Sequence, residues 1–249
     1  MDLRIQRSVV SHLRTRPKAV ETGPFVVGID PDTDSPHINY ATPLPGAAVT
    51  ATDVTALVET FTAAGRKPRL EYVTSSSPGL EDLLLAAGFA VEARHEYLIC
   101  TPRTLGAFSV PEGVLLAEPE SDPDRAALIV ALNEAFGEAP QASEADVARL
   151  RRNQERGGLA LAAVAGAECA GGGQAMPPQD GVSEIGGIGV REPFRRRGLG
   201  GAITAEIARR IFGRGVEIAW LEAGGDDSWR VYERAGFAPA GRRLYISRA

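Results

Sequence analysis

The sequence has few of the residue types that would place it in a specialised structural class. Its 249 residues include only two cysteines, Cys100 and Cys169, and three histidines, and none of these stand at the spacing of metal ligands. The 28 glycines and 17 prolines follow no repeating triplet. A disulfide framework, a structural metal site and a fibre are therefore not expected.

Long apolar runs and an excess of positive charge are also absent. No apolar stretch reaches the roughly 18 to 20 residues of a membrane helix, and the first ten residues lack the apolar core of a secretory signal. Acidic residues (32) outnumber basic ones (27), whereas binding to a phosphate backbone needs a concentrated positive face. We expect a cytoplasmic protein with neither a membrane nor a nucleic acid as partner; RNA binding would need Arg195 and its neighbours to extend into a stripe with Arg149, Arg151 and Arg152.

The chain contains an internal repeat. Aligning Phe89 with Phe237 superposes residues 70–97 on residues 218–245. Each copy has a short β-rich run, a polar turn, an amphipathic helix, the letters A-G-F-A and a final strand. The identical pairs are Ala87/Ala235, Gly88/Gly236, Phe89/Phe237, Ala90/Ala238, Arg94/Arg242 and Tyr97/Tyr245. The repeat predicts two related lobes, residues 1–104 and 105–249, divided at a linker near residues 101–112.

Strands and helices are predicted in both lobes. In the first, residues 24–30 and 36–44 indicate strands, and residues 52–64 indicate a helix with Thr52 as its N-cap. In the second, helices are predicted to begin at about residues 122, 143 and 200, and three antiparallel strands to cover residues 159–190. The class is α+β (mixed α/β), with a mostly antiparallel twisted sheet flanked by helices in each lobe.

A turn rich in arginine and glycine follows the strand that ends at Val190. It runs from Arg195 to Gly201 and leads directly into a helix. Glycines let backbone N–H groups approach a ligand closely, and a helix N-terminus carries partial positive charge, so the turn predicts an anion site. Three adjacent arginines indicate several phosphates. The spacing fits neither the P-loop nor the dinucleotide fingerprint, since Ile203 occupies the third glycine position of the latter.

Three motifs in order resemble the GNAT family of acyl-CoA-dependent N-acetyltransferases. The turn gives Arg-x-x-Gly-x-Gly at residues 195–200, and the preceding strand, residues 184–190, has the family form E-I-x-x-I-x-V. Residues 225–237 match a third family motif around a Val-Tyr and a Gly-Phe pair, with Gly225 and Ser228 replacing its Asn and Ala. The resemblance covers residues 114–249, and residues 24–100 only as a degenerate copy.

The resemblance implies acetyl-CoA as co-substrate, no metal, and a primary amine of a small molecule or protein as acceptor. In the family, the strand carrying Ile188, Gly189 and Val190 separates from its neighbour and pairs with the pantetheine arm. The pyrophosphate would be held by the turn, whose residues are Arg195, Arg196, Arg197, Gly198, Leu199, Gly200 and Gly201.

Two side chains are candidates for proton transfer. Tyr232 is the candidate general acid, because an ordinary thiol titrates near ~8.5 and a phenol near ~10; a position at the edge of the core is the alternative. Glu184 matches a glutamate that serves as general base in many family members, and a structural role or a role in binding substrate charge is the alternative.

The first copy departs from the family where chemistry would be expected. It has no Arg-x-x-Gly-x-Gly, and Leu84 stands where the second copy has Tyr232. We therefore expect it to bind no CoA, and either to shape the acceptor site or only to cover apolar surface. The degenerate copy and the lost Asn leave a second function open, that of a non-catalytic acyl-CoA sensor or scaffold. The chain is expected as a monomer or homodimer.

Overall fold

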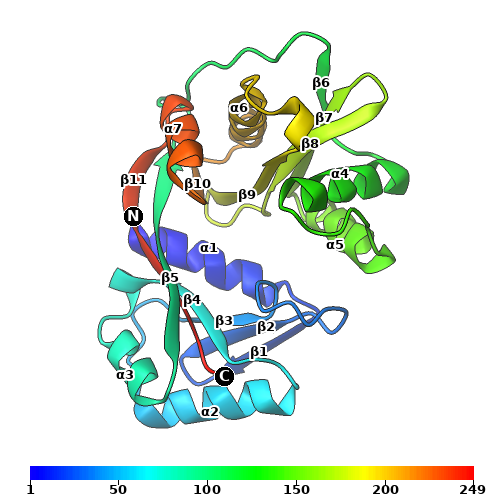
Figure 1. The fold of residues 1–249 in the computed structure, drawn as a ribbon. Coiled ribbons are helices and arrows are strands. Elements are labelled where there is room, and N and C mark those ends of the chain that lie inside the picture. Colours follow the sequence, from blue (N-terminus) through cyan, green and yellow to red (C-terminus); the bar gives the residue numbers. More distant parts are fainter. The chain divides into compact units, whose positions relative to one another are not determined.

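The computed structural model describes residues 1–249, and the chain forms two compact units. The first comprises residues 1–97 and 240–249, and the second residues 98–239. Figure 1 shows the course of the chain. The helices are α1 (Asp2–Arg14), α2 (Ala51–Ala63), α3 (Leu80–Ala86), α4 (Asp122–Ala135), α5 (Glu144–Glu155), α6 (Leu199–Gly213) and α7 (Asp226–Arg234). The strands are β1 (Lys18–Thr22), β2 (Phe25–Ile29), β3 (Tyr40–Pro43), β4 (Arg69–Val73), β5 (Ala90–Cys100), β6 (Val114–Ala117), β7 (Leu159–Ala165), β8 (Glu168–Ala175), β9 (Val182–Val190), β10 (Ile218–Glu222) and β11 (Ala238–Ser247).

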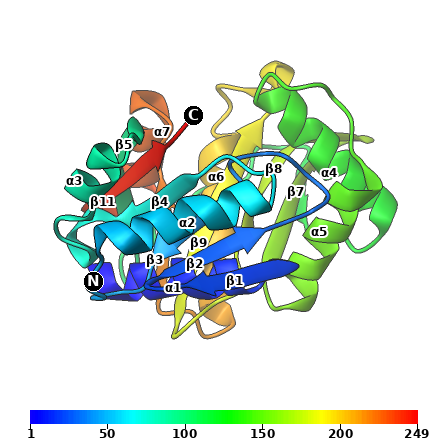
Figure 2. The same cartoon turned by 90° about the horizontal axis from the view of Figure 1, so that it is seen from below.

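The first unit is a sheet with helices on both faces. Its strand order is β1-β2-β3-β4-β11-β5, and of the registered pairs only β3 with β4 is parallel. In Figure 2, α1 and α2 lie on opposite sides of strands β1 to β3. Phe25, Leu57, Phe61, Leu70 and Leu84 are fully buried in the core on the α2 and α3 face.

Helix α2 confirms the helix predicted over residues 52–64, but its N-cap lies two residues earlier than predicted. The N-cap is Thr50 and not Thr52. The Thr50 hydroxyl accepts a hydrogen bond from the Asp53 amide at 3.3 Å, and the Asp53 carboxylate accepts one from the Thr50 amide at 2.8 Å. This reciprocal capping box satisfies two amides that no helical carbonyl can reach, so Thr50 makes the better cap.

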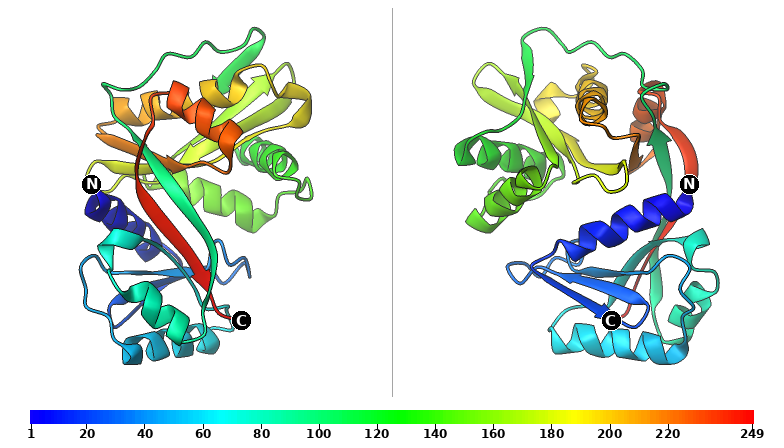
Figure 3. Two further views of the ribbon diagram at one scale, coloured as in Figure 1. Left: turned by 60° about the vertical axis from the view of Figure 1, so that its left-hand side comes forward. Right: turned by 180° about the vertical axis from the view of Figure 1, so that it is seen from behind.

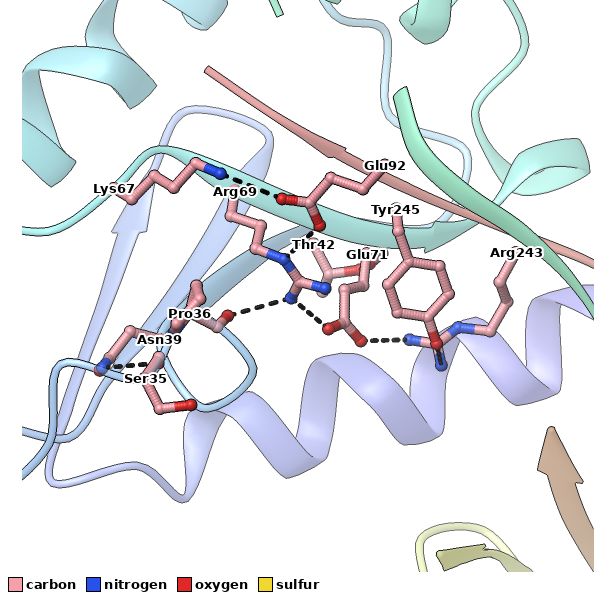
Figure 4. A network of polar contacts seen from close by, with 10 residues as sticks. All are labelled: Ser35, Pro36, Asn39, Thr42, Lys67, Arg69, Glu71, Glu92, Arg243 and Tyr245. Atoms are coloured by element: carbon pink, nitrogen blue, oxygen red, sulfur yellow. Dashed lines mark hydrogen bonds and ion pairs between the residues drawn. The ribbon is translucent and has the colours of Figure 1, made fainter. Parts of the chain in front are cut away.

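Buried charges bind the C-terminal strand β11 into the first unit. Arg69 and Arg243 are each 2% exposed, and both donate to the carboxylate of Glu71, Arg243 at 3.2 Å (Figure 4). Both guanidinium groups lie 5.4 Å from the centre of the Tyr245 ring. Arg69 also donates to Glu92 at 2.7 Å. Since removing one partner would leave an uncompensated buried charge, the cluster fixes the register of β11 against β4.

The second unit has the predicted antiparallel strands and helices on both sheet faces. Strands β6, β7, β8 and β9 pair antiparallel in order, and β9 pairs parallel to β10. Figure 3 shows α4 and α5 on one side of these strands and α6 on the other. The core on the α6 face includes Ile185, Ile203, Ile207 and Phe237. Together the two units confirm the predicted α+β class and its mostly antiparallel pairing.

The compact units differ from the predicted lobes at the C-terminus. The compact units divide within β5, between Tyr97 and Leu98, whereas the predicted lobes divide at residues 104/105. Residues 240–249, however, group with the first unit although they follow the second in sequence. The repeat itself has matching elements, since β4, α3 and β5 occupy the same aligned positions as β10, α7 and β11. No helix has both the length and the apolar character needed to cross a membrane.

Candidate functional site

Strand β9 separates from β10 after its first three residues. The parallel register runs from Val182↔Ile218 to Glu184↔Trp220 and ends there, although β9 continues to Val190. On its other side, β9 carries one extra residue relative to β8, because Gly172 pairs with Gly189 but Gln174 pairs with Gly186. A bulge of this kind bends a strand. The separation expected from the resemblance is therefore present at the backbone level.

Glycines make this bent strand possible. Gly187, inside the bulge, has φ +61, a conformation that other residues rarely adopt. A Cβ at Gly171 would lie 2.2 Å from the carbonyl oxygen of Gly189, so β8 and β9 approach more closely there than any side chain permits. Gly189 in turn packs against Leu132 and Ala135 of α4. These glycines thus serve the bulge and the close packing of β8, β9 and α4.

Arg195 fixes the position of the turn after β9 through two hydrogen bonds to backbone carbonyls. Its Nε donates to the carbonyl of Val190 at 2.8 Å, and its Nη2 donates to the carbonyl of Ala135 at 2.8 Å. Arg195 is thus a positioning residue that ties the turn to the end of β9 and to the last residue of α4. Two further residues, Arg196 at φ +62 and Gly198 at φ +79, are in the left-handed region.

Helix α6 begins directly after this turn with amides that have no helical acceptor. Its first helical hydrogen bond joins the Ala202 amide to the carbonyl of the N-cap residue Gly198 at 3.1 Å. The amides at Leu199, Gly200 and Gly201 precede it and have no carbonyl one turn earlier in the helix. Together with the helix dipole they form a donor set suited to a phosphate group.

A groove of about 350 Å³ lies over this helix start. It is lined by Val190, Phe194, Arg195, Arg196, Gly198, Leu199, Gly200, Gly201, Val231 and Arg234. A second hollow, lined by Arg230, Glu233 and Arg234, adjoins it through the shared Arg234. The structure therefore brings most of the predicted turn residues to one groove. Ile188, Gly189 and Arg197 are not among its lining residues, and the Arg197 guanidinium lies 5.8 Å from the Phe194 ring centre.

The arginines of the groove form no ion pairs. Arg195, Arg196 and Arg234 have no carboxylate partner, whereas Arg191 pairs with Glu134 and Glu168 at 2.8 and 2.9 Å. On α6, Arg209 and Arg210 both pair with Glu206. No carboxylate of the protein neutralises the positive charges of these three arginines. The groove therefore favours an anionic ligand.

Tyr232 lies in the core on the face of α7 that packs toward α6. It is 7% exposed, its ring centre is 6.4 Å from that of Phe237, and its hydroxyl makes no hydrogen bond within the protein. Burial raises the pKa of Tyr232 to about 12. The phenol is therefore protonated throughout the neutral range, but it is a weaker acid than the sequence suggested. Full proton transfer to an ordinary thiolate would be uphill by roughly 3 to 4 pKa units.

Glu184 stands at the point where β9 and β10 separate, since it belongs to their last registered pair. Its side chain is half-buried, and its carbonyl accepts a hydrogen bond from the Met176 amide at 2.8 Å. The adjacent Ser183 and Ile185 are buried. The position suits a group that would act near the end of a ligand lying between the strands.

Three groove residues escaped the sequence reasoning, namely Phe194, Val231 and Arg234. Phe194 is in the short 3-10 turn Glu192–Phe194, directly before the three arginines from which the anion site was predicted. Val231 and Arg234 are on α7, which is brought to the α6 start only by tertiary packing. Their spacing of three places them on one helix face, a signal that the sequence offered. The described residues contain no group of three or more His, Cys, Asp or Glu side chains suited to a metal ion.

The part of the chain that carries this geometry is similar to a known protein family. Residues 126–237, which contain β9, the turn, α6 and α7, match the model of the acetyltransferase (GNAT) family. The fold is that of a GNAT acetyltransferase. No curated protein matches the sequence.

Solved GNAT structures resemble the whole chain. A GCN5-related N-acetyltransferase from Kribbella flavida is 25% identical over 100% of this chain and 95% of its own, with a TM-score of 0.82. One from Sphaerobacter thermophilus is 19% identical over 91% and 80%, with a TM-score of 0.64. A tandem GNAT protein from the clavulanic acid biosynthesis pathway is 16% identical over 90% and 77%, with a TM-score of 0.62. At the last two identities the likeness concerns the fold.

Proposed function

We propose that the chain is an acetyl-CoA-dependent N-acetyltransferase whose second unit binds the donor. The acceptor is a primary amine of a small molecule or of a protein. The observation that supports this most strongly is the groove at the start of α6, where free helix amides and arginines without ion pairs meet the end of a strand that has separated from its neighbour.

The groove residues fit an acyl-CoA by their chemistry. The amides of Leu199, Gly200 and Gly201 would bind the pyrophosphate, with Arg196 and Arg234 neutralising its charge. The part of β9 beyond Glu184 offers backbone groups to the pantetheine amides. The donor supplies the thioester, whose C–S bond is replaced by a C–N bond to the amine.

Two residues would assist the acetyl transfer, one as a proton acceptor and the other as a hydrogen-bond donor. Glu184, at the separation of the strands, would take the proton that the amine loses, directly or through a water. The Tyr232 hydroxyl, which has no partner in the protein, would donate a hydrogen bond to the departing thiolate. Because burial keeps this phenol protonated, it is available as a donor across the pH range in which amines react.

The first unit is proposed as a degenerate copy without a donor site. It has the matching elements β4, α3 and β5, but its helix α2 is preceded by Thr50 and a capping box in place of the arginine-glycine turn. Its helix start is satisfied by its own side chains and offers no comparable donor set.

Calorimetric titration with acetyl-CoA tests the proposal. The wild type should bind with a micromolar Kd, and Gly198→Asp should lose binding because it places a carboxylate at the helix start. Arg209→Gln on α6 is the matched control, since that arginine is exposed and already paired with Glu206. Absence of binding by the folded wild type would contradict the proposal.

Thiol release then separates an enzyme from a sensor. Free CoA should appear when a panel of small amines and peptide N-termini is supplied. A non-catalytic acyl-CoA sensor is the second candidate, favoured by the exclusion of Tyr232 from the groove lining. Tight binding without thiol release over the whole panel would establish that second function.

A further inference from the structure

The parallel strands β3 and β4 of the first unit are separated by a side chain. They share one registered pair, Ala41↔Leu70. Beyond it, Gln6 of α1 reaches between them and is fully buried. Its Nε2 donates to the carbonyl of Pro43 at 2.8 Å, and its Oε1 accepts from the amide of Val73 at 2.9 Å. At Pro43 and Val73 the two strands are thus joined through the Gln6 carboxamide.

Every hydrogen-bonding group of this carboxamide is used. The second Nε2 proton goes to the Thr42 hydroxyl at 2.7 Å, and that hydroxyl donates to the Glu71 carbonyl at 2.7 Å. A primary amide has two donors and a carbonyl acceptor, and here both donors and the acceptor have partners. The space bounded by Thr42, Pro43 and Val73, which we term the amide slot, therefore matches a carboxamide in one orientation.

The amide slot occupies the position at which the second unit opens its strands. In the repeat alignment Leu70 corresponds to Ile218, and both begin the parallel register of their pair. Val73 then corresponds to Leu221, the first residue of β10 beyond the last registered pair Glu184↔Trp220. The register ends after Leu70 in the first unit and two aligned residues later, after Trp220, in the second. Beyond these pairs, the backbone groups of Val73 and Leu221 need another source of hydrogen bonds.

We infer that the amide slot is a carboxamide-binding site which the first unit fills with its own Gln6. The second unit leaves the corresponding opening to an external ligand. The comparison with acyl-CoA, whose pantetheine arm contains amides, rests on the proposed function; the assignment of the amide slot does not. One consequence is that a chain binds one acyl-CoA and not two.

Replacement of Gln6 followed by addition of a free amide tests the site in the full-length chain. Gln6→Ala should lower the Tm, because it opens a cavity and leaves the Val73 amide and the Pro43 carbonyl unpaired. Acetamide should then raise the Tm of Gln6→Ala by several degrees relative to its effect on the wild type. Acetone, which has the same shape but no N–H donor, should not.

Gln6→Met provides the matched variant, since it fills the space without hydrogen-bonding groups. It should fold, show no rescue by acetamide, and lose hydrogen-exchange protection at the Val73 amide by tenfold or more. Equal effects of acetamide on Gln6→Ala and Gln6→Met, or unchanged protection of Val73 in Gln6→Met, would overturn the inference.

These readouts involve no acyl-CoA, so they remain interpretable if the proposed activity fails. If acetyl-CoA binds, titration of the wild type should give one site per chain. Two sites per chain would contradict the inference while leaving the proposed function intact.

Discussion

Arg196 combines a strained backbone with an unpaired charge at the groove. Its φ of +62 is unfavourable for a residue with a side chain, by about 1 kcal/mol relative to glycine. Strain retained at such a position is common at ligand sites, and the proposed phosphate contact gives this side chain a role that glycine cannot supply.

Replacing Arg196 with glycine should therefore stabilise the folded protein and weaken ligand binding. Arg196→Gly is expected to raise the free energy of unfolding by about 1 kcal/mol and to weaken acetyl-CoA binding several-fold. Arg196→Ala removes the same charge but keeps the strain, so it should weaken binding without stabilising. Thermal unfolding and calorimetry measure the two effects; unchanged affinity in both variants would remove Arg196 from the phosphate site.

Tyr232 can be tested without disturbing the core, because its hydroxyl has no partner in the protein. Tyr232→Phe should lower kcat tenfold or more while leaving the Kd for acetyl-CoA and the Tm nearly unchanged. Tyr72→Phe, which alters a buried tyrosine of the first unit, is the control. Wild-type turnover in Tyr232→Phe would leave the tyrosine a purely structural role.

At the scale of elements, α7 adds a positive wall to the groove. Arg234 lines both the groove and the adjoining hollow, and Arg230 lies one turn earlier on the same helix. Neither has a carboxylate partner. Their placement favours a phosphate group beyond the pyrophosphate held at the start of α6.

The donor's 3′-phosphate is the group that this wall should distinguish. Arg234→Gln is expected to weaken CoA binding several-fold and to weaken 3′-dephospho-CoA binding much less. Arg209→Gln again serves as the control. The ratio of the two Kd values is measured by calorimetry, and an equal loss for both ligands would assign Arg234 to another part of the donor.

The elements show which features a sequence can predict and which it cannot. Helix α2 and strands β7 to β9 follow from local periodicity, and the turn before α6 from its glycines and arginines. Strand β1, by contrast, was missed because its residues Lys18 to Thr22 are mostly exposed and lack an apolar alternation. The contribution of Arg234 depends on packing between α6 and α7, which no local pattern encodes.

At the scale of the whole molecule, the repeat in sequence and the compact units in space do not coincide. The repeat assigns β11 to the second copy, whereas the structure places residues 240–249 in the first unit, between β4 and β5. Local propensity predicted the strand itself. Its partners depend on long-range contacts, among them the buried Glu71 and Arg243.

Deletion of residues 240–249 should therefore damage the unit at the other end of the chain. Without β11 the first unit loses an inner strand, and Glu71 loses a buried cationic partner. Hydrogen exchange should show lost protection in residues 1–97 and retained protection in residues 98–239. Selective loss in residues 98–239 would contradict the assignment of the strand.

Acid should weaken the first unit through Glu92. Burial raises the pKa of Glu92, but hydrogen bonds from Ser247, Arg69 and Lys67 outweigh this and lower it from 4.5 to about 2. A lowered folded-state pKa gives stability that is present above about 4.5 and is lost as the pH falls toward 2. The Tm difference between wild type and Glu92→Gln should thus shrink over this interval; a constant difference would show that the carboxylate contributes no such stability.

The place of β11 has a consequence for synthesis on the ribosome. Residues 1–97 emerge first, yet their sheet lacks an inner strand until residues 240–249 have also emerged. The second unit, residues 98–239, needs no segment that is made after it and can fold as soon as it has emerged. The first unit to be started is then the last to be completed, and until β11 is in place it exposes two unpaired strand edges that a chaperone could bind.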